Sequence, residues 1–337
     1  MKEEIFRPFI TPSIRTDLAI EAEEIIKEKT KQEIPGVKSE VEHTANCCVT
    51  RMEILDSRGE ELLGKEQGRY VTIECLELKK RAKEVHEEVS RILVTELENL
   101  LPESEEATFL VIGLGNWNTT PDALGPQVVG KLLVTRHLFE YAPPELTGGM
   151  RAVSALAPGV LGLTGIETLE IVKGVVERIK PSALIAIDAL AARDTNRVST
   201  TIQISDTGIH PGSGIGNKRL AINQESLGIP VLAIGVPTVV HALTIVDNAL
   251  NIIERELVSS QNKIEFNNQF KRTLQKIEAE EKERLLASAL SPVLGELIVT
   301  PKDIDVIIED ISQVIAGGIN GALHQGIALE ELFAYTN

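Results

Sequence analysis

The chain has 337 residues, 43% of them apolar, which is enough for one large hydrophobic core and a smaller subdomain. Asp and Glu number 50 against 34 Lys and Arg, and the resulting charge of −16 disfavours sequence-independent binding of nucleic acids. Aromatic residues are only 3% of the chain, so platforms for stacking bases are not expected either. The three cysteines, two of them adjacent, indicate neither a disulfide framework nor a zinc site, and a reducing cytoplasm fits them best.

Residues 1–17 contain two prolines and no helical period, so an extended arm is predicted for them. The N-terminal stretch MKEEIFRPFI lacks the apolar segment of a secretory signal. The chain also has no run approaching the roughly 18–20 continuous apolar residues of a membrane span, so no membrane contact is expected.

The segment 18–100 is predicted to form an N-terminal region of helices and strands. Residues 45–78 alternate between polar and apolar positions, which predicts a β-meander with turns at 57–59 and near Gly68. The helices of this region are predicted at 18–32 and 80–101.

From residue 107 onward, apolar strands alternate with amphipathic helices. The runs TFLVIGL, SALIAIDAL and IPVLAIGVP are short and apolar almost throughout, which is typical of strands buried on both faces of a sheet. In the sequence TGIETLEIVKGVVERIK, Thr164 and Glu167 have the spacing of a capping box at a helix start. Further strands are predicted at 149–156 and 199–205, and helices at 123–138, 164–180 and 239–257.

Strands that alternate with helices predict parallel βαβ units. The expected fold class is therefore α/β: a doubly wound, mostly parallel sheet flanked by helices, with an N-terminal β-meander and a C-terminal helical extension. The predicted regions are the arm 1–17, the N-terminal helix and meander 18–100, the α/β catalytic core 101–258, and the helical region 259–337 packed on that core.

The loop in VIGLGNWNTTPDALGP, which follows the first core strand, matches the motifs that hold phosphates only in part. Gly113 and Gly115 match the first two positions of the dinucleotide fingerprint, but Asn118 stands where the third glycine is needed. The chain from Trp117 to Pro121 is too long for a helix N-terminus to hold a pyrophosphate, and no P-loop lysine follows. A nucleotide-binding oxidoreductase or regulatory module is therefore an alternative function that the glycine pattern disfavours. A non-catalytic scaffold is a second alternative.

Two aspartates follow apolar strands of the predicted sheet. Asp122 lies in the loop after the first core strand, and Asp188 ends the apolar run SALIAID. In open α/β sheets the crevice beyond the carboxyl ends of the strands is where ligands bind. Two carboxylates in one cleft share a proton and can act as an acid/base couple, which is the chemistry of peptide hydrolysis. A cap or turn role for each aspartate is the simpler alternative.

A resemblance to a known family is carried by five segments: RTDLAIEA at 15–22, GLGNWNTTPDALGP at 113–126, SALAPGVLGLTGIET at 154–168, AIDALAARDTNRVSTTIQISDTGIHPGSGIGN at 186–217 and VPTVVHA at 236–242. In these the chain resembles the germination proteases of spore-forming bacteria, endopeptidases that degrade small acid-soluble spore proteins. Their core is in turn similar to that of hydrogenase-maturation endopeptidases, which supports the doubly wound prediction. The resemblance implies that Asp122 and Asp188 are the two essential aspartates of an atypical aspartic-type protease, with no established metal requirement and no cofactor.

The resemblance also implies an inactive precursor that removes its own N-terminal arm. RTDLA is similar to the site at which the family cuts its substrates after Glu, so self-cleavage is expected between Asp17 and Leu18. The further implications are small acid-soluble spore proteins as substrates, a homotetramer, a location in the cytoplasm of the forespore or spore core, and neither nucleic acid nor membrane as a direct partner.

Two chemical questions stay open at this point. A divalent metal on Asp122, Asp188 and His241 is an alternative of the hydrogenase-maturation type, although a structural role is the simpler interpretation of the histidine.

Recognition of an acidic residue before the cleaved bond needs a cation, because a carboxylate must be paired. The candidates are Arg193, Lys218 and Arg219.

Overall fold

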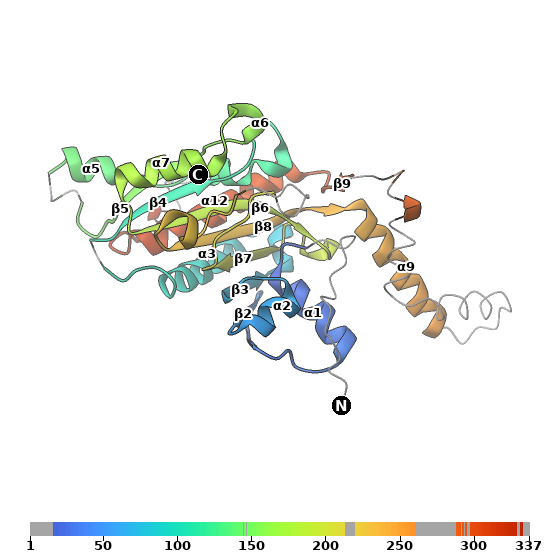
Figure 1. The fold of residues 1–337 in the computed structure, drawn as a ribbon. Coiled ribbons are helices and arrows are strands. Elements are labelled where there is room, and N and C mark those ends of the chain that lie inside the picture. Colours follow the sequence, from blue (N-terminus) through green and yellow to red (C-terminus); the bar gives the residue numbers. More distant parts are fainter. Residues whose placement is uncertain are drawn as a thin grey trace.

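The computed structural model describes residues 16–104, 106–143, 145, 147–212, 220–259, 288–290, 292, 294, 297–328 and 331–332. Within these residues one sheet of nine strands runs through the molecule, in the order β1-β2-β3-β7-β8-β6-β4-β5, with β9 paired to β8 (Figure 1). The strands are β1 Val37–His43, β2 Cys48–Ile54, β3 Gly68–Glu74, β4 Thr108–Gly113, β5 Ala152–Leu156, β6 Ala183–Ala192, β7 Thr201–Ser205, β8 Val231–His241 and β9 Ile298–Val299.

Helices connect these strands and cover the sheet. The α-helices are α1 Ala19–Thr30, α2 Ser57–Leu63, α3 Lys83–Glu98, α4 Leu124–Val129, α5 Arg136–Tyr141, α6 Leu161–Thr164, α7 Thr168–Ile179, α8 Gln224–Leu227, α9 Ala242–Ser259 and α12 Ile304–Leu323. Short 3-10 helices lie at η1 Leu76–Lys80, η2 Thr120–Asp122 and η4 Thr195–Arg197.

The α/β prediction is confirmed, and the sheet as a whole is mixed. Strands β5, β4, β6 and β8 pair in parallel, as the alternation of strands and helices requires. The N-terminal strands β1, β2 and β3 are antiparallel, and β3 joins the core through an antiparallel pairing with β7. The meander is therefore a continuation of the catalytic sheet and not a separate layer.

Alternate residues of the parallel strands build two hydrophobic cores. On one face, Val111 and Ile187 pack with residues of α3, α4 and α12. On the other face, Ile112 and Ala186 pack with residues of α7 and with Leu18, the residue that precedes α1. Helices α3 and α7 accordingly lie on opposite sides of the sheet (Figure 1). Burial on both faces explains why these strands are apolar throughout.

Three local predictions were wrong. The turn expected at 57–59 is the first turn of α2, because the Asp56 side chain accepts hydrogen bonds from Arg58 N and Gly59 N and caps a helix there. The helix expected at 123–138 is broken at Gly130, where α4 ends, and α5 begins at Arg136. Thr164 does not cap α7: its Oγ1 accepts from Ile166 N at 3.1 Å, and the helix begins after Glu167.

Helix α12 explains the long apolar segment near the C-terminus. By length and composition this helix is apolar enough to cross a membrane. However, 72% of its apolar stretch is buried inside the protein. Gly318 lets it approach α3 closely, since a Cβ at this position would lie 2.6 Å from Leu93 Cβ. It is therefore a core helix of the sheet.

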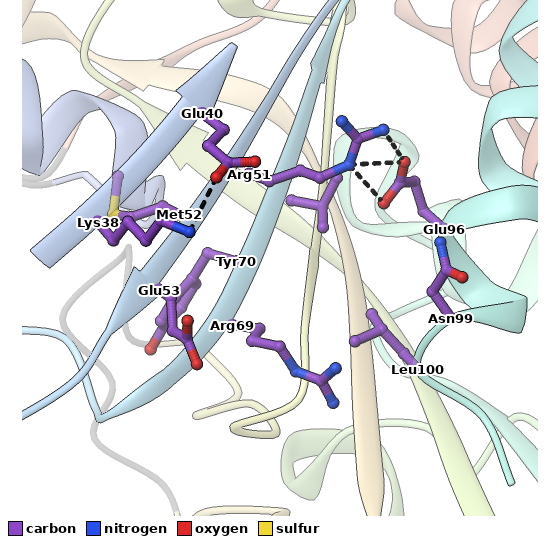
Figure 2. A pocket seen from close by; sticks show the side chains of 11 residues that line it. Lys38, Glu40, Arg51, Met52, Glu53, Arg69, Tyr70, Glu96, Asn99 and Leu100 are labelled. Atoms are coloured by element: carbon purple, nitrogen blue, oxygen red, sulfur yellow. Dashed lines mark hydrogen bonds and ion pairs between the residues drawn. The ribbon is translucent and has the colours of Figure 1, made fainter. Parts of the chain in front are cut away.

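A charged clamp attaches the N-terminal strands to α3. Arg51 on β2 donates from Nε to Glu96 Oε1 and Oε2 at 3.0 and 3.1 Å, and the Glu96 side chain is only 3% exposed (Figure 2). Lys38 and Glu40 pair at 2.9 Å on the neighbouring strand. These residues line a cavity of about 200 Å³ on the meander. Two ion pairs, Arg51–Glu96 and Lys38–Glu40, thus lie within its lining, which is the pattern of a structural contact.

Buried His324, which follows α12, generates a prediction about stability. Its Nε2 lies 3.0 Å from the carbonyl oxygen of Leu133, so the neutral ring carries its proton on Nε2. Burial lowers the pKa of His324 below its ordinary 6.5, and Arg151 acts in the same direction. As the pH falls below 6.5, His324 is protonated in the unfolded chain before it is protonated in the folded chain. We therefore expect the free energy of unfolding to fall by up to about 1.4 kcal/mol for each pH unit between 6.5 and the lowered pKa.

Denaturant unfolding of the wild type and of His324→Gln, from about pH 7 to pH 5, measures this contribution. The variant is expected to lose that part of the pH dependence, whereas His43→Gln, at an exposed site, is expected to keep it. The same slope in the wild type and in His324→Gln would contradict the assignment.

Candidate active site

The register of the parallel strands places the site at their carboxyl ends. Pairing of β4 with β6 ends at Gly113 opposite Ile187, so Asp188 is the first residue of β6 beyond β4. On its other side Asp188 lies opposite Gly235 of β8. Asp188 is 6% exposed, and its Oδ1 accepts from Ala189 N at 2.9 Å. Strand β6 continues to Ala192, so Asp188 lies within the strand and not at its end as predicted.

Three glycines press the loop after β4 against the sheet. A Cβ on Gly113 would lie 2.1 Å from Gly125 O, and a Cβ on Gly125 would lie 2.6 Å from Ile187 O. Gly115 has φ +113°, and a Cβ there would lie 2.0 Å from Asp122 O. Leu114 N completes the contact by donating to Ile187 O at 2.8 Å. Backbone contact of this kind leaves the loop that carries Asp122 little freedom relative to β6.

Asp122 has a structural contact within this loop. It ends η2, is half-buried, and accepts from Asn116 N at 2.9 Å through Oδ2. The turn interpretation considered for the sequence is therefore correct as far as it goes. The same hydrogen bond fixes the direction of the carboxylate, which a positioned acid or base also needs.

A cavity of about 150 Å³ brings together the residues that the sequence singled out. Its lining contains both Asp122 and Asp188, and also Asp17, the residue before the expected cleavage point. His210 lies on the same wall, with its Nε2 2.9 Å from Glu66 Oε1. Residues far apart in the chain thus meet at one edge of the sheet.

Asp17 is attached to the end of β6 by its backbone and by its side chain. Its N–H donates to Ala191 O at 3.0 Å, and its Oδ2 accepts from Ala191 N at 2.9 Å. Its carbonyl oxygen accepts from Lys65 Nζ at 2.9 Å and from Gln203 Nε2 at 3.4 Å. The next residue, Leu18, is fully buried in the core. Neither residue was predicted: Lys65 lies in none of the matching segments, and Gln203, although within the matching segment 186–217, is far from Asp17 in the chain.

An ionic cluster around buried Glu21 and Arg197 holds α1 beside this edge. Glu21 accepts from Arg193 N and Asp194 N, both at 2.8 Å, and burial raises its pKa. The guanidinium of Arg197 binds both Glu24 carboxylate oxygens at 2.6 Å and Glu74 Oε1 at 2.8 Å. These contacts fix the start of α1, and with it the position of Asp17 and Leu18.

Of the three basic residues predicted to recognise an acidic side chain, the structure describes only Arg193. Arg193 Nη2 lies 4.0 Å from Asp247 Oδ2 on α9, and Arg193 does not belong to the lining of the cavity. Lys218 and Arg219 lie outside the residues that the structure describes. The Asp17 carboxylate accepts a hydrogen bond from the backbone N–H of Ala191.

The metal alternative needs three ligands in one place. His241 is the last residue of β8 and pairs with Ile298 of β9. Across the described part of the chain, no group of three or more His, Cys, Asp or Glu side chains is arranged to hold a metal ion. Asp122, Asp188 and His241 are therefore not a preformed ligand set in this arrangement.

Comparison with known proteins gives consistent matches over nearly the full chain. The family model described as germination protease matches residues 15–274 and 261–336. The germination protease of Caldanaerobacter subterraneus subsp. tengcongensis is 50% identical over 96% of this chain and 98% of its own. Those of Clostridium perfringens and Clostridium tetani are 48% and 45% identical, with similar coverage. Among solved structures, the nickel–iron hydrogenase maturation protease HycI of Thermococcus kodakarensis matches at 20% identity and a TM-score of 0.28, over 42% of this chain and 80% of its own.

These matches place the chain among endopeptidases, here built on an α/β sheet with a cavity at the carboxyl ends of its parallel strands. The chain belongs to the germination protease family, and it is accordingly a protease of spore germination.

The glycine contacts under the loop generate a prediction. Gly113→Ala forces a methyl group against the backbone of Gly125, and we expect it to lower the free energy of unfolding by about 1–3 kcal/mol. Gly130→Ala is the matched control, because Gly130 has φ −65° and a Cβ there would lie 3.4 Å from Gln127 O. It is expected to stay within about 0.5 kcal/mol of the wild type. Denaturant unfolding compares the two, and equal stabilities would show that the loop does not depend on this contact.

Proposed function

We propose that the chain is the zymogen of an endopeptidase that uses Asp122 and Asp188 to cut its own Asp17–Leu18 bond. After removal of residues 1–17, the same pair hydrolyses small acid-soluble spore proteins after Glu. The observation that supports this most strongly is that both aspartates line one cavity together with Asp17. Because Asp17 of the same chain lies there, the first cleavage is expected within one molecule.

The proposed chemistry follows from two carboxyl groups that share a proton. The ionised carboxylate takes a proton from water, and the water oxygen forms a bond to the Asp17 carbonyl carbon. The carbonyl π electrons move to oxygen and give a tetrahedral oxyanion. When this collapses, the C–N bond to Leu18 breaks and the protonated carboxyl donates to the leaving nitrogen. The products are a new carboxylate on Asp17 and a new amine on Leu18.

Recognition of an acidic residue before the cleaved bond is supported by the contact of Asp17 with β6. The N–H of Ala191 donates to the Asp17 carboxylate, and a backbone donor of this kind suits Asp and Glu alike. Arg193, Lys218 and Arg219 stay candidates for additional pairing with that carboxylate. The substrate would thus be bound at the end of β6 partly through its own backbone, as Asp17 is.

The setting that we propose is the cytoplasm of the forespore and the spore core, where the substrates are. A homotetramer is proposed from the resemblance of the sequence, and no membrane or nucleic-acid partner is required. Exposed apolar side chains on the described surface, such as Leu163 on α6 and Ile166 shortly after it, are candidates for contacts between subunits.

The aspartate pair is tested by replacing each carboxyl group with an amide. Asp122→Asn and Asp188→Asn keep the size of the side chain but cannot shuttle a proton, so we expect self-cleavage to slow by about 100- to 10,000-fold in a folded protein. The measurement is the mass of the purified full chain over time.

Asp194→Asn is the control, because Asp194 caps η4 through a hydrogen bond from Asn196 N that asparagine can also accept. Cleavage at the wild-type rate in either active-site variant would remove that aspartate from the mechanism. Loss of wild-type cleavage on chelation, restored by an added divalent metal, would favour the alternative with metal on Asp122, Asp188 and His241.

The contact between Asp17 and Ala191 gives a second test. Asp17→Ala removes the acceptor of the 2.9 Å hydrogen bond, so we expect cleavage at this position to slow by about 10- to 100-fold. Asp17→Asn keeps an acceptor oxygen and is expected to slow it less. Time courses of cleavage, with the site assigned by mass, compare the two. Equal rates for the wild type and Asp17→Ala, at the same bond, would exclude this mode of recognition.

A further inference from the structure

Two side-chain donors converge on one peptide oxygen beside the aspartates. The carbonyl oxygen of Asp17 accepts from Lys65 Nζ at 2.9 Å and from Gln203 Nε2 at 3.4 Å. Neither residue belongs to the lining of the cavity that holds Asp122 and Asp188. Asp17 itself lines that cavity, so the residue whose carbonyl oxygen the two donors bind lies at the same cavity as the two carboxyl groups.

The local structure aims both donors at this oxygen. Helix α2 ends at Gly64, which adopts the left-handed conformation, and Lys65 follows it directly. Its ammonium group also donates to Thr16 O at 3.2 Å, which holds the amine along the backbone of residues 16 and 17. Gln203, in the buried strand β7, accepts from Ala19 N through Oε1 at 2.7 Å. Because a backbone N–H can only donate, this bond fixes the orientation of the amide and turns Nε2 toward Asp17.

A partly buried lysine whose ammonium group contacts a neutral carbonyl oxygen lowers the stability of the fold. A purely structural role therefore explains this contact poorly. An ammonium group loses hydration when it is buried. The carboxylates of Asp17 and Glu21 offset part of that cost, but the neutral peptide oxygens that Lys65 contacts directly offset little of it. The balance changes when the carbonyl carries negative charge, because a donor aimed at developing charge in a water-poor site is worth several kcal/mol. The contact is therefore better matched to a transition state than to the resting peptide.

We propose that Lys65, assisted by Gln203, stabilises the oxyanion formed when water attacks the Asp17 carbonyl carbon. This inference rests on the proposed self-cleavage at Asp17–Leu18 and adds a residue to it. In the step concerned, the water oxygen bonds to carbon and the π electron pair moves to the carbonyl oxygen, while one water proton passes to the aspartate pair. Lys65 keeps its proton and contributes charge and a hydrogen bond. When the C–N bond breaks, the electron pair returns and the contact weakens.

If Lys65 stabilises the oxyanion, the rate of self-cleavage depends on whether the lysine is protonated. A purely structural contact predicts no such pH dependence. Burial lowers the pKa of Lys65 below its ordinary 10.5, and the carboxylates of Asp17 and Glu21 oppose this shift. Only the protonated amine stabilises an oxyanion. Self-cleavage is therefore expected to decline as the pH rises through the lowered pKa of Lys65. Arginine stays protonated throughout that range, so Lys65→Arg is expected to lose the decline.

The experiment measures self-cleavage of the purified full chain by mass, across neutral to alkaline pH, together with thermal unfolding. Lys65→Met removes the charge and the donors, and we expect cleavage to slow by about 100-fold or more. Lys65→Arg is expected to cleave and to keep its rate at alkaline pH. Lys83→Met is the control, at a lysine that is 81% exposed on α3, and it is expected to cleave like the wild type.

Each result decides the question. Cleavage of Lys65→Met within about threefold of the wild type would overturn the proposal. If Lys65→Met does not fold, the pH profiles decide: the same alkaline decline in Lys65→Arg and the wild type, or a folded Lys65→Arg that never cleaves, would each overturn it. A wild-type chain that does not cut at Asp17–Leu18 would instead overturn the proposed function, and this inference with it.

Discussion

The site depends on the stretch of β6 that runs past the end of β4. Beyond Ile187, no strand in the described part of the chain pairs with this edge of β6, and its backbone groups bind other segments. Leu114 N donates to Ile187 O and fixes the loop that carries Asp122, while Ala189 N donates to the Asp188 side chain. Ala191 pairs through both its N–H and its carbonyl with Asp17. Backbone groups that a sheet would otherwise leave unpaired thus assemble the two aspartates and the bond proposed to be cut.

Charged side chains then fix the position of α1 relative to β6, which the backbone hydrogen bonds alone do not determine. Glu21 is 2% exposed and binds the first two N–H groups after β6, and Arg197 links Glu24 of α1 to Glu74 of β3. Removing one partner of such a cluster leaves an unpaired charge in the interior, so the cluster tolerates few other positions for α1. Since Leu18 is buried at the start of that helix, the Asp17–Leu18 bond is held between a rigid helix and a rigid strand. In our proposal this rigidity is what presents the bond to the aspartate pair.

The sequence predicted the parts of this structure that a regular pattern encodes. The apolar runs predicted β4, β6 and β8, and the fold class followed from their alternation with helices. Strand β1 was missed because VKSEVEH is a largely exposed edge strand without an apolar face, and α2 because a side-chain cap at Asp56 outweighed a turn-like composition. Asp122 and Asp188 were selected by their positions after strands. Lys65 and Gln203 could not be, because only the folded chain brings them to Asp17.

In the proposed reaction, water attacks the carbonyl carbon of Asp17 at the aspartate pair. Self-cleavage of the full chain in water enriched in oxygen-18, followed by mass spectrometry of both products, shows where the water oxygen goes. We expect a released peptide that ends at Asp17 and carries one heavy oxygen in its new carboxylate, and an unlabelled chain that begins at Leu18. Release of a peptide that ends at another residue, or an intact chain under these conditions, would contradict the proposed reaction.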